Sequence, residues 1–235
     1  MPEHPSVTDP VDSAPVLFRW PPASAFGRTV PKTKFYEHGN IGTALGEKFI
    51  RDIQRITWAY KLAEDTIRRR STTAVPEIQV FTVETKGTDV SDDVLTAIDK
   101  AVQFPIIFEI ASNDRVRTVG VHKTLQGKTP ALGPYFSTPW YPADTPRRPL
   151  PTALDLPSLY EAILSTLLPI GMRAGESVSE ATERLSRTRK LQREIAALEK
   201  KMRTEPQLNR KIELRRQITD RTAVLAELTD PVPSN

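Results

Sequence analysis

The C-terminal part of the chain carries a seven-residue repeat, and this repeat constrains the fold more than any other feature of the sequence. Ala181, Thr188, Ile195 and Met202 recur at this interval, with leucines beside them. A repeat of seven favours a long helix that packs lengthwise on another helix. We therefore predict a helix over 178–203, about 39 Å long at a rise of about 1.5 Å per residue.

A second helix is predicted directly after the first. The stretch 204–207 reads T-E-P-Q, which matches a capping box with a proline near the new helix start. A second apolar stripe follows at Leu214, Ile218, Leu225 and Leu228. Because the connection is short, we expect the two helices to fold back as an antiparallel, coiled-coil-like hairpin.

Positive charge is concentrated in this predicted hairpin. The whole chain has a net charge of +4, from 33 Lys and Arg against 29 Asp and Glu. The segment from Arg184 to Arg221 holds 13 basic and 5 acidic residues, a net of +8, so the rest of the chain sums to −4. Such an asymmetry indicates a surface for an acidic partner or nucleic acid, although a solvated helix face has the same composition. The candidate binding residues are Arg187, Arg189, Lys190, Arg193, Lys200, Lys201, Arg203, Arg210, Lys211, Arg215 and Arg216.

The stretch EIQVFTVETK, residues 77–86, predicts a β-strand that ends in an E-x-K pair. In a strand, alternate side chains share a face, so Glu84 and Lys86 point the same way. A Mg²⁺-dependent nuclease needs this arrangement, because a carboxylate binds the metal and a lysine stabilises charge. Asp65, which follows the preceding predicted strand, is the candidate second carboxylate. Under this alternative Glu84, Lys86 and Asp65 are catalytic, and Asp65 and Glu84 hold Mg²⁺.

The surroundings of the E-x-K pair are compatible with a PD-(D/E)xK nuclease core in part. The predicted order is helix, strand, E-x-K strand, helix and strand. That core has one more strand before the E-x-K strand, which the sequence does not indicate, and no proline precedes Asp65. The ordinary interpretation is that Glu84 and Lys86 lie at a solvated strand end, where an ion pair contributes little stability.

The residues before the hairpin predict one α/β (α+β) domain with a central mixed sheet. We assign 1–29 to a disordered or extended proline-rich arm, 30–170 to the domain, 176–229 to the hairpin and 230–235 to a disordered tail. Within this frame, aromatic residues between 17 and 39 are expected to insert into the core from an extended strap. The elements expected are a helix from Thr43, a strand over 56–62, a helix capped by Ser91, a β-hairpin within 105–123, a loop over 125–134 and a helix capped by Asp155.

Several classes of site are excluded or lack support. The chain has no cysteine, which excludes disulfides and zinc–thiolate centres. No apolar run approaches the roughly 20 residues that span a bilayer, and the N-terminus lacks the features of a signal peptide. We therefore expect a cytoplasmic protein without a membrane partner. Phosphate-binding and serine-hydrolase motifs are absent from the sequence, and no cofactor is expected outside the Mg²⁺ alternative.

Six phrases of the sequence, taken together and in order, resemble the bacterial and archaeal family called domain of unknown function 4391. The similarity runs from about Val30 to Leu228, and Pro206 departs from the family's usual pattern without breaking the predicted hairpin. The phrases are VPKTKFYE, ITWAYKLAEDTI, EIQVFTVETK, IDKAVQFPIIFEI, RVRTVGVHK and LEKKMRTEPQLNRKIEL. The resemblance implies no established activity. It implies a genomic setting beside helicases and DNA methyltransferases in restriction-like phage-defence operons.

Three functions are compatible with these features. The first is a non-catalytic accessory subunit that docks through its hairpin on a larger protein of the helicase or methyltransferase class. The second is the Mg²⁺-dependent nuclease described above. The third is a sequence-independent nucleic-acid binder, whose backbone contacts would be strongly salt-sensitive. Because no aromatic residue is interleaved with the hairpin's cations, base stacking there is not expected.

Overall fold

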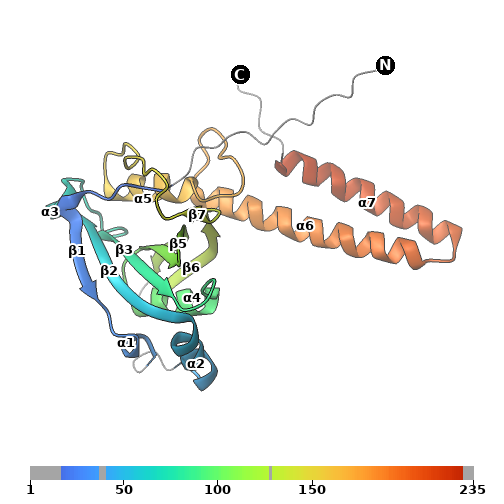
Figure 1. The fold of residues 1–235 in the computed structure, drawn as a ribbon. Helices are drawn as coiled ribbons and strands as arrows, with labels where there is room; N and C mark the ends of the chain where they lie inside the picture. The colour runs from blue at the N-terminus through green and yellow to red at the C-terminus, as the bar shows by residue number, and fades with distance from the viewer. Residues whose placement is uncertain (1–16, 37–40, 127–128, 230–235) are drawn as a thin grey trace, which may run out of the picture.

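The computed structural model describes residues 17–36, 41–126 and 129–229 (Figure 1). It shows an α+β fold with one mixed seven-stranded sheet and a pair of long helices. The strand order is β1-β2-β3-β4-β5-β6, with β7 paired to β5. β3 and β4 are parallel, and every other pair is antiparallel. The predicted mixed sheet is therefore confirmed.

The strands are β1 (Ala25–Thr29), β2 (Ile53–Ala63), β3 (Glu77–Thr85), β4 (Ile106–Ser112), β5 (Arg115–Gln126), β6 (Thr129–Ser137) and β7 (Tyr141–Pro142). The helices are η1 (Pro22–Ser24), α1 (Thr33–Tyr36), α2 (Thr43–Asp52), α3 (Glu64–Ile67), α4 (Asp92–Ala101), α5 (Leu156–Ser165), α6 (Val178–Thr204) and α7 (Leu208–Thr229). We call the sheet with η1 and α1 to α5 the body, and α6 with α7 the helical hairpin.

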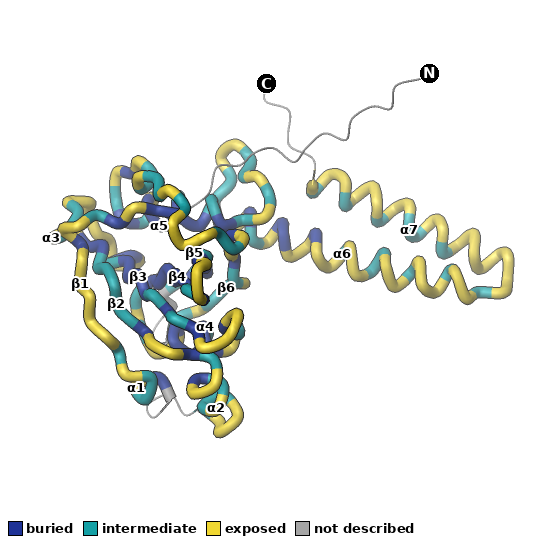
Figure 2. Tube along the Cα trace, viewed as in Figure 1, coloured by how far each residue is buried: buried dark blue, intermediate teal, exposed yellow. Residues whose placement is uncertain are grey.

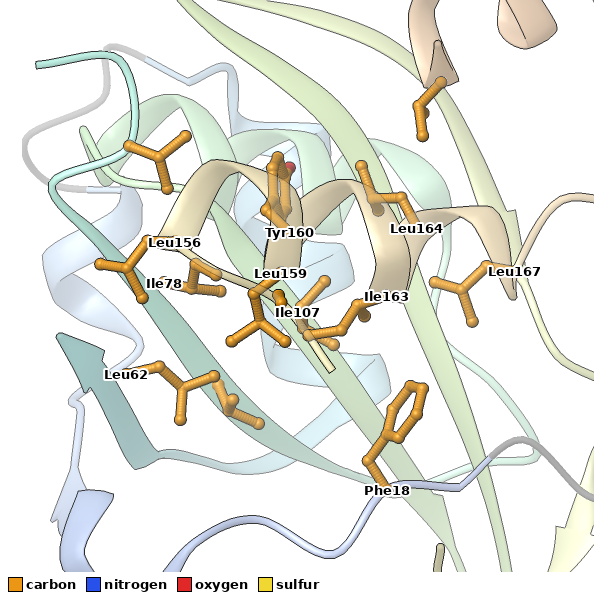
Figure 3. Close-up of a cluster of buried hydrophobic side chains, with 14 of the residues drawn as sticks. Phe18, Leu62, Ile78, Ile107, Leu156, Leu159, Tyr160, Ile163, Leu164 and Leu167 are labelled. Atoms are coloured by element: carbon orange, nitrogen blue, oxygen red, sulfur yellow. The ribbon is translucent and has the colours of Figure 1, made fainter. Parts of the chain in front are cut away.

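One face of the sheet is covered by α5 (Figure 3). The predicted cap is present, because the Asp155 carboxylate accepts a hydrogen bond of 2.9 Å from the Ser158 backbone N–H. Leu159 and Ile163 then lie against the sheet, both almost completely buried. Val178 and Leu185, from the first turns of α6, belong to the same apolar cluster. The base of the hairpin is therefore built into the core of the body.

The opposite face of the sheet is covered by α2 and α4, which contribute Phe49, Val94 and Ile98 to a second buried cluster. β3 serves both clusters, because alternate side chains of a strand point to opposite faces. Val80 lies in the first cluster and Phe81 in the second. Burial on both faces explains why the apolar residues of β3 occur at both even and odd positions of the strand.

The predicted boundary of the domain at residue 30 is too late. Leu17, Phe18 and Trp20 are buried, as expected for a strap that inserts its rings, but β1 also joins the sheet as an edge strand. β1 escaped prediction because all its residues are exposed, so it lacks the alternation of a half-buried strand. Residues 1–16 and 230–235, predicted to be disordered, lie outside the described residues.

Two local predictions are wrong. The segment 125–134, expected to be a loop, contributes to β5 and β6, which pair as an antiparallel hairpin. Its prolines are tolerated because β6 is an edge strand. The capping box expected at 204–207 does not form, since the Thr204 hydroxyl donates to the backbone oxygen of Lys201 at 3.1 Å. The Glu205 carboxylate accepts from the Gln207 backbone N–H at 3.1 Å instead.

Candidate interaction surface on the helical hairpin

The helical hairpin stands out from the body (Figures 1 and 2). α6 runs outward from the sheet, and α7 returns beside it in the opposite direction. Burial falls along this arm. Val178, Ala181, Leu185 and Thr188 are buried near the base of α6, whereas α7 has no buried residue. The hairpin is therefore anchored at one end and surrounded by solvent at the other.

A thin apolar seam joins the two helices. Ile195 and Leu198 of α6, together with Leu214 and Ile218 of α7, are half-buried rather than buried. An ion pair crosses the seam, with 3.0 Å between Arg221 Nε and Glu194 Oε2. The apolar stripes predicted from the sequence are thus the contact between the helices, but two helices alone do not remove them from water.

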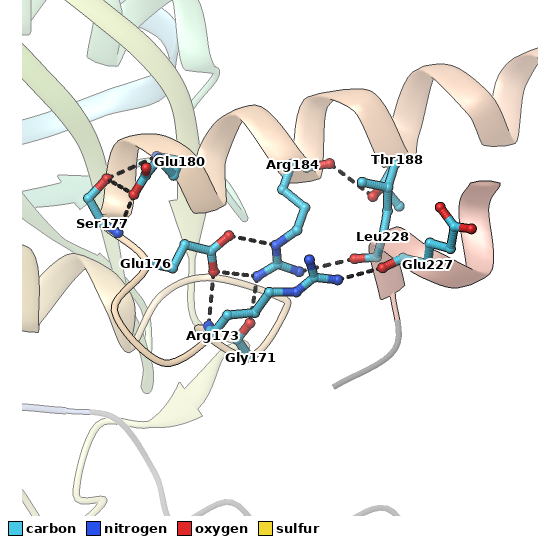
Figure 4. A network of polar contacts seen from close by, with 9 residues as sticks. All are labelled: Gly171, Arg173, Glu176, Ser177, Glu180, Arg184, Thr188, Glu227 and Leu228. Carbon is cyan, nitrogen blue, oxygen red and sulfur yellow. Dashed lines mark hydrogen bonds and ion pairs between the residues drawn. The ribbon is translucent and has the colours of Figure 1, made fainter. Parts of the chain in front are cut away.

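Arg184 holds the base of the hairpin together (Figure 4). Its Nε and Nη2 donate to the two carboxylate oxygens of Glu176, each at 2.7 Å. Nη2 also donates to the backbone oxygen of Gly171 at 2.8 Å, and Nη1 to that of Leu228 at 3.2 Å. Arg173 Nη2 donates to the neighbouring oxygen of Glu227 at 2.6 Å. Two cations therefore bind the C-terminal carbonyls of α7, where the helix dipole favours positive charge.

The electrostatics of this base follow from its geometry. The side chain of Arg184 is 8% exposed and that of Glu176 is 10% exposed, so the pair is shielded from water. The hydrogen bonds from Arg184 lower the pKa of Glu176, and the carboxylate in turn raises the pKa of Arg184. Both groups therefore remain charged at neutral pH. The pair fixes where α6 leaves the body and where α7 ends.

The eleven cations predicted to form a binding surface are all exposed on the hairpin. Arg187 lies 3.9 Å from the Glu183 carboxylate, and Arg210 lies 3.8 Å from that of Glu205. Within the described residues the other nine form no ion pair: Arg189, Lys190, Arg193, Lys200, Lys201, Arg203, Lys211, Arg215 and Arg216. The hairpin therefore presents positive charge that the described part of the chain does not neutralise.

The hairpin tip, which we define as residues 199–212, combines charge with exposed apolar surface. Leu208 is 71% exposed and Ile212 is 60% exposed. Because they are four residues apart on α7, their side chains lie on one face of the helix. Lys200, Lys201, Arg203, Arg210 and Lys211 belong to the same tip. Exposed apolar side chains with a polar rim are an arrangement found at protein interaction sites.

The E-x-K residues lie at the far end of β3, and each has a partner within the fold. Arg55 Nε donates to Glu84 Oε1 at 2.8 Å across the β2–β3 pair. The two side chains are 57% and 29% exposed, as expected for a solvated pair at a strand end. Lys86 Nζ donates to the backbone oxygen of Ile50 at 2.6 Å.

The structure does not bring Asp65 near Glu84. β2 and β3 are antiparallel, with Ala63 opposite Glu77 and Arg55 opposite Glu84. Asp65 follows Ala63, so it lies at the other end of β3, about 23 Å away at about 3.3 Å per residue. It pairs there with Lys61 at 3.7 Å. β1 supplies a further strand before β3, so the strand count does not argue against a nuclease core, but Asp65 and Glu84 cannot share one cation.

Asp52 is the acidic residue nearest to Lys86 along the strand pair, and sequence reasoning did not select it. The Lys86 backbone N–H donates to the Asp52 backbone oxygen at 2.9 Å. The Asp52 carboxylate accepts from Arg51 Nε at 2.6 Å and from Arg51 Nη2 at 3.0 Å. Across the described ranges, no three His, Cys, Asp or Glu side chains are grouped in a way that could hold a metal ion.

Sequence reasoning also missed the anchoring roles of Arg173 and Arg184. A signal for Arg184 was present, because it lies three residues after Ala181 and four before Thr188. That spacing places it on the inward stripe of α6, where a solvated cation is not expected. For Arg173, which lies in the connection between α5 and α6, the sequence offers no comparable signal.

Comparison with known proteins identifies the family of the chain. No curated protein and no solved structure was found to match it. In the described part of the chain, no helix is long and apolar enough to cross a membrane. A family model, described as a domain of unknown function (DUF4391), matches residues 18–225, which include both the sheet and nearly all of the hairpin. The chain belongs to the DUF4391 family.

Proposed function

We propose that this protein is a non-catalytic accessory subunit that docks on a larger nucleic-acid-processing enzyme through its hairpin tip. One observation carries the proposal: Leu208 and Ile212 are exposed at the end of a projecting arm, among cations of which only Arg210 has a carboxylate partner in the described chain. The family resemblance, with its setting beside helicases and methyltransferases, supports the class of the partner. The bacterial cytoplasm is the compartment that goes with such a role.

The chemistry of the tip indicates what the partner's surface must offer. Burying Leu208 and Ile212 requires an apolar groove or a helix face. The cations around them require acidic groups at the rim, where complementary charge steers association and selects the partner. We infer that a helical segment of the partner completes the thin seam between α6 and α7 in coiled-coil fashion, because the half-buried stripes leave room for further apolar contact.

Docking through the tip also agrees with the way the hairpin is fixed. Arg184 and the first turns of α6 tie the base to the body, so the tip is held at a constant place without being covered. An arm that is already ordered loses less conformational entropy on binding than a disordered tail. The remaining surface of the body is then free for its own contacts.

The test compares matched apolar substitutions at the tip and on the body. The tip variant is Leu208→Ser with Ile212→Ser, and the control is Leu154→Ser with Ile50→Ser, whose side chains are 89% and 56% exposed on the body. The tagged full-length protein and both variants are purified from the cells that produce it, at low salt. The wild type and the control are expected to retain a nucleic-acid enzyme in stoichiometric amount. The amount of enzyme retained by the tip variant should be lower by about tenfold or more, as expected when an anchor residue of an interface is removed.

Two outcomes contradict the proposal. If the tip variant retains the same partner as the control, docking lies elsewhere on the molecule. If the chain alone binds duplex DNA with an affinity that falls steeply with salt, and Lys200→Glu with Lys201→Glu removes that binding, the protein is a nucleic-acid binder instead. An Arg51→Glu, Arg69→Glu variant carries the same charge change on the body and serves as its control.

A further inference from the structure

A cavity of about 1050 Å³ lies on the body, at the edge of the sheet that ends in β1. Its walls are the cavity-facing side chains of β1, β2 and β3, the segment around α1 and the C-terminal end of α4. Ligand-binding cavities in proteins measure about 300–1,000 Å³, so this one is large enough for a small organic molecule. It is separate from the hairpin tip.

Aromatic rings form one wall of the cavity. The ring centroids of Phe26 and Trp58 are 4.1 Å apart, and Trp58 stacks on Phe81 at 6.1 Å with an angle of 7° between the rings. Phe81 is buried, whereas Phe26 is 38% exposed. A hydrogen bond of 3.0 Å from Trp58 Nε1 to the Tyr60 backbone oxygen fixes the indole. The wall thus offers a rigid aromatic surface that a planar group can stack on.

Two irregularities of the sheet aim these side chains into the cavity. The β2–β3 register shifts between Trp58 and Tyr60, so Trp58 joins the α4 side of the sheet while Tyr60 packs on the opposite side. The β1–β2 register shifts between Ala25 and Arg28, around Gly27 with a φ of +65°. Such bulges redirect side chains and are frequent next to functional sites. In this protein they place Phe26, Arg28 and Trp58 on the same cavity wall.

The mouth of the cavity is positively charged. Among the described residues, it is lined by the cations Arg28, Lys34, Lys61 and Lys100 and by one carboxylate, Glu77. Lys61 lies 3.6 Å from Glu77, while the other three cations form no ion pair among the described residues. The Arg28 guanidinium lies over the Phe26 ring at 5.1 Å. A ligand that enters this mouth therefore gains most if it carries negative charge.

The far rim of the cavity is held in place by a buried lysine. Lys123 Nζ donates to the backbone oxygens of Asp99 at 2.6 Å and Phe104 at 2.8 Å, and also to that of Val102. These carbonyls belong to the end of α4 and the residues after it, which line the cavity. A cation at the C-terminus of a helix neutralises its unpaired carbonyls. This rim of the cavity is therefore fixed by contacts within the body.

We propose that this cavity binds a nucleotide, with the base packed against the exposed Phe26 ring of the aromatic wall and the phosphate held by Arg28 and Lys100. A nucleobase has a π-face for the aromatic wall and polar edges for the Glu77 and Gln79 side chains, which both line the cavity. Gln79 is bound to Glu77, so the pair presents both a donor and an acceptor. An acyl chain would use neither the hydrogen-bonding groups of this pair nor the face of an aromatic ring.

The test is calorimetric titration of the full-length protein with adenosine, guanosine, cytidine and uridine 5′-monophosphates. At least one is expected to bind saturably. Adenosine without phosphate and ribose 5-phosphate without base should each bind about tenfold more weakly or worse, because each lacks one of the two contacts. Phe26→Ala should weaken nucleotide binding about tenfold, and Arg28→Gln with Lys100→Gln should do the same. Arg51→Gln with Arg69→Gln is the control and should leave binding unchanged.

Three results overturn the proposal. The first is that no monophosphate binds at millimolar concentration. The second is that Phe26→Ala and the control variant bind the nucleotide with equal affinity, while circular dichroism shows that both are folded. The third is that decanoate or a short oligothymidylate binds through Phe26 while the mononucleotides do not, which would assign the cavity to an anionic amphiphile or to a nucleic-acid strand.

Discussion

The body and the hairpin of this protein are built in opposite ways. The body buries two apolar clusters, one on each face of its sheet, and its central strands contribute to both. The hairpin buries side chains only in the first turns of α6, within the described residues, and its second helix buries none. Besides these apolar contacts, a polar base formed by Arg173, Glu176 and Arg184 holds the hairpin in place.

This difference shows which part of the molecule is complete by itself. A domain whose apolar faces are covered on both sides has no further need of a partner for its stability. A pair of helices with half-buried stripes and exposed leucine and isoleucine at the tip still has apolar surface to cover. The contrast is the physical basis for assigning attachment to the hairpin and ligand binding to the body.

Removing Arg184 is expected to have the largest effect, because it leaves Glu176 shielded from water without a counter-charge. Arg184→Leu should lower the free energy of unfolding by about 3–5 kcal/mol. In urea denaturation, Arg184→Leu with Glu176→Leu should recover much of that loss, since no isolated charge remains. Amide hydrogen exchange should accelerate in the last turn of α7, whose carbonyls lose a donor. A loss below about 1 kcal/mol would mean that the base does not anchor the hairpin.

Leucine-to-alanine substitutions in the two regions should lower the free energy of unfolding by different amounts. Leu159 is 2% exposed in the body, so Leu159→Ala should lower the free energy of unfolding by about 2–5 kcal/mol. Leu225 is half-buried in the hairpin seam, so Leu225→Ala should cost about 1 kcal/mol. Both variants are measured by the same denaturation experiment. Equal costs would show that the hairpin is packed as tightly as the body.

The body should also lose stability as the pH rises from about 4 to 6, because of the buried carboxyl of Asp99. Burial raises the pKa of Asp99 to about 6, although Lys123 and the Tyr135 hydroxyl stabilise its charged form. From about pH 4 to pH 6 the folded protein keeps a proton that the unfolded chain releases, so this residue's contribution to stability falls as the pH rises. The wild type should lose about 2–3 kcal/mol relative to Asp99→Asn across this window, since one pKa unit corresponds to about 1.4 kcal/mol. A constant difference between the two proteins would contradict this assignment.

Local signals in the sequence were sufficient for most helices and for the central strands. The Asp155 cap, the strand-forming stretch of β3 and the heptad repeat of α6 all act within a few residues, and each of these three predicted elements is present. β1 and β6 were not predicted. β1 is exposed along its length, and β6 contains prolines that are compatible only with a sheet edge.

The sites depend on contacts between distant parts of the chain, and the sequence predicted them less well. The hairpin's cations could be named from composition, because basic residues outnumber acidic ones by 13 to 5 between Arg184 and Arg221. Arg184 and its partners at Gly171 and Leu228 meet only once the hairpin closes. The cavity requires Phe26, Trp58 and Lys100 to converge from three elements through two register shifts, which no local pattern encodes.

The central claim is that the hairpin is a stiff arm whose tip stands clear of the body. Because the chain has no cysteine, single cysteines can be placed at Asn209 in the tip and at Arg69 on the body for spin labelling. Electron–electron dipolar spectroscopy on this pair should give one narrow distance distribution longer than about 40 Å, since α6 alone extends about that far from its base. A short distance, or a broad distribution reaching down to contact, would mean that the tip folds onto the body, and the attachment role would fail.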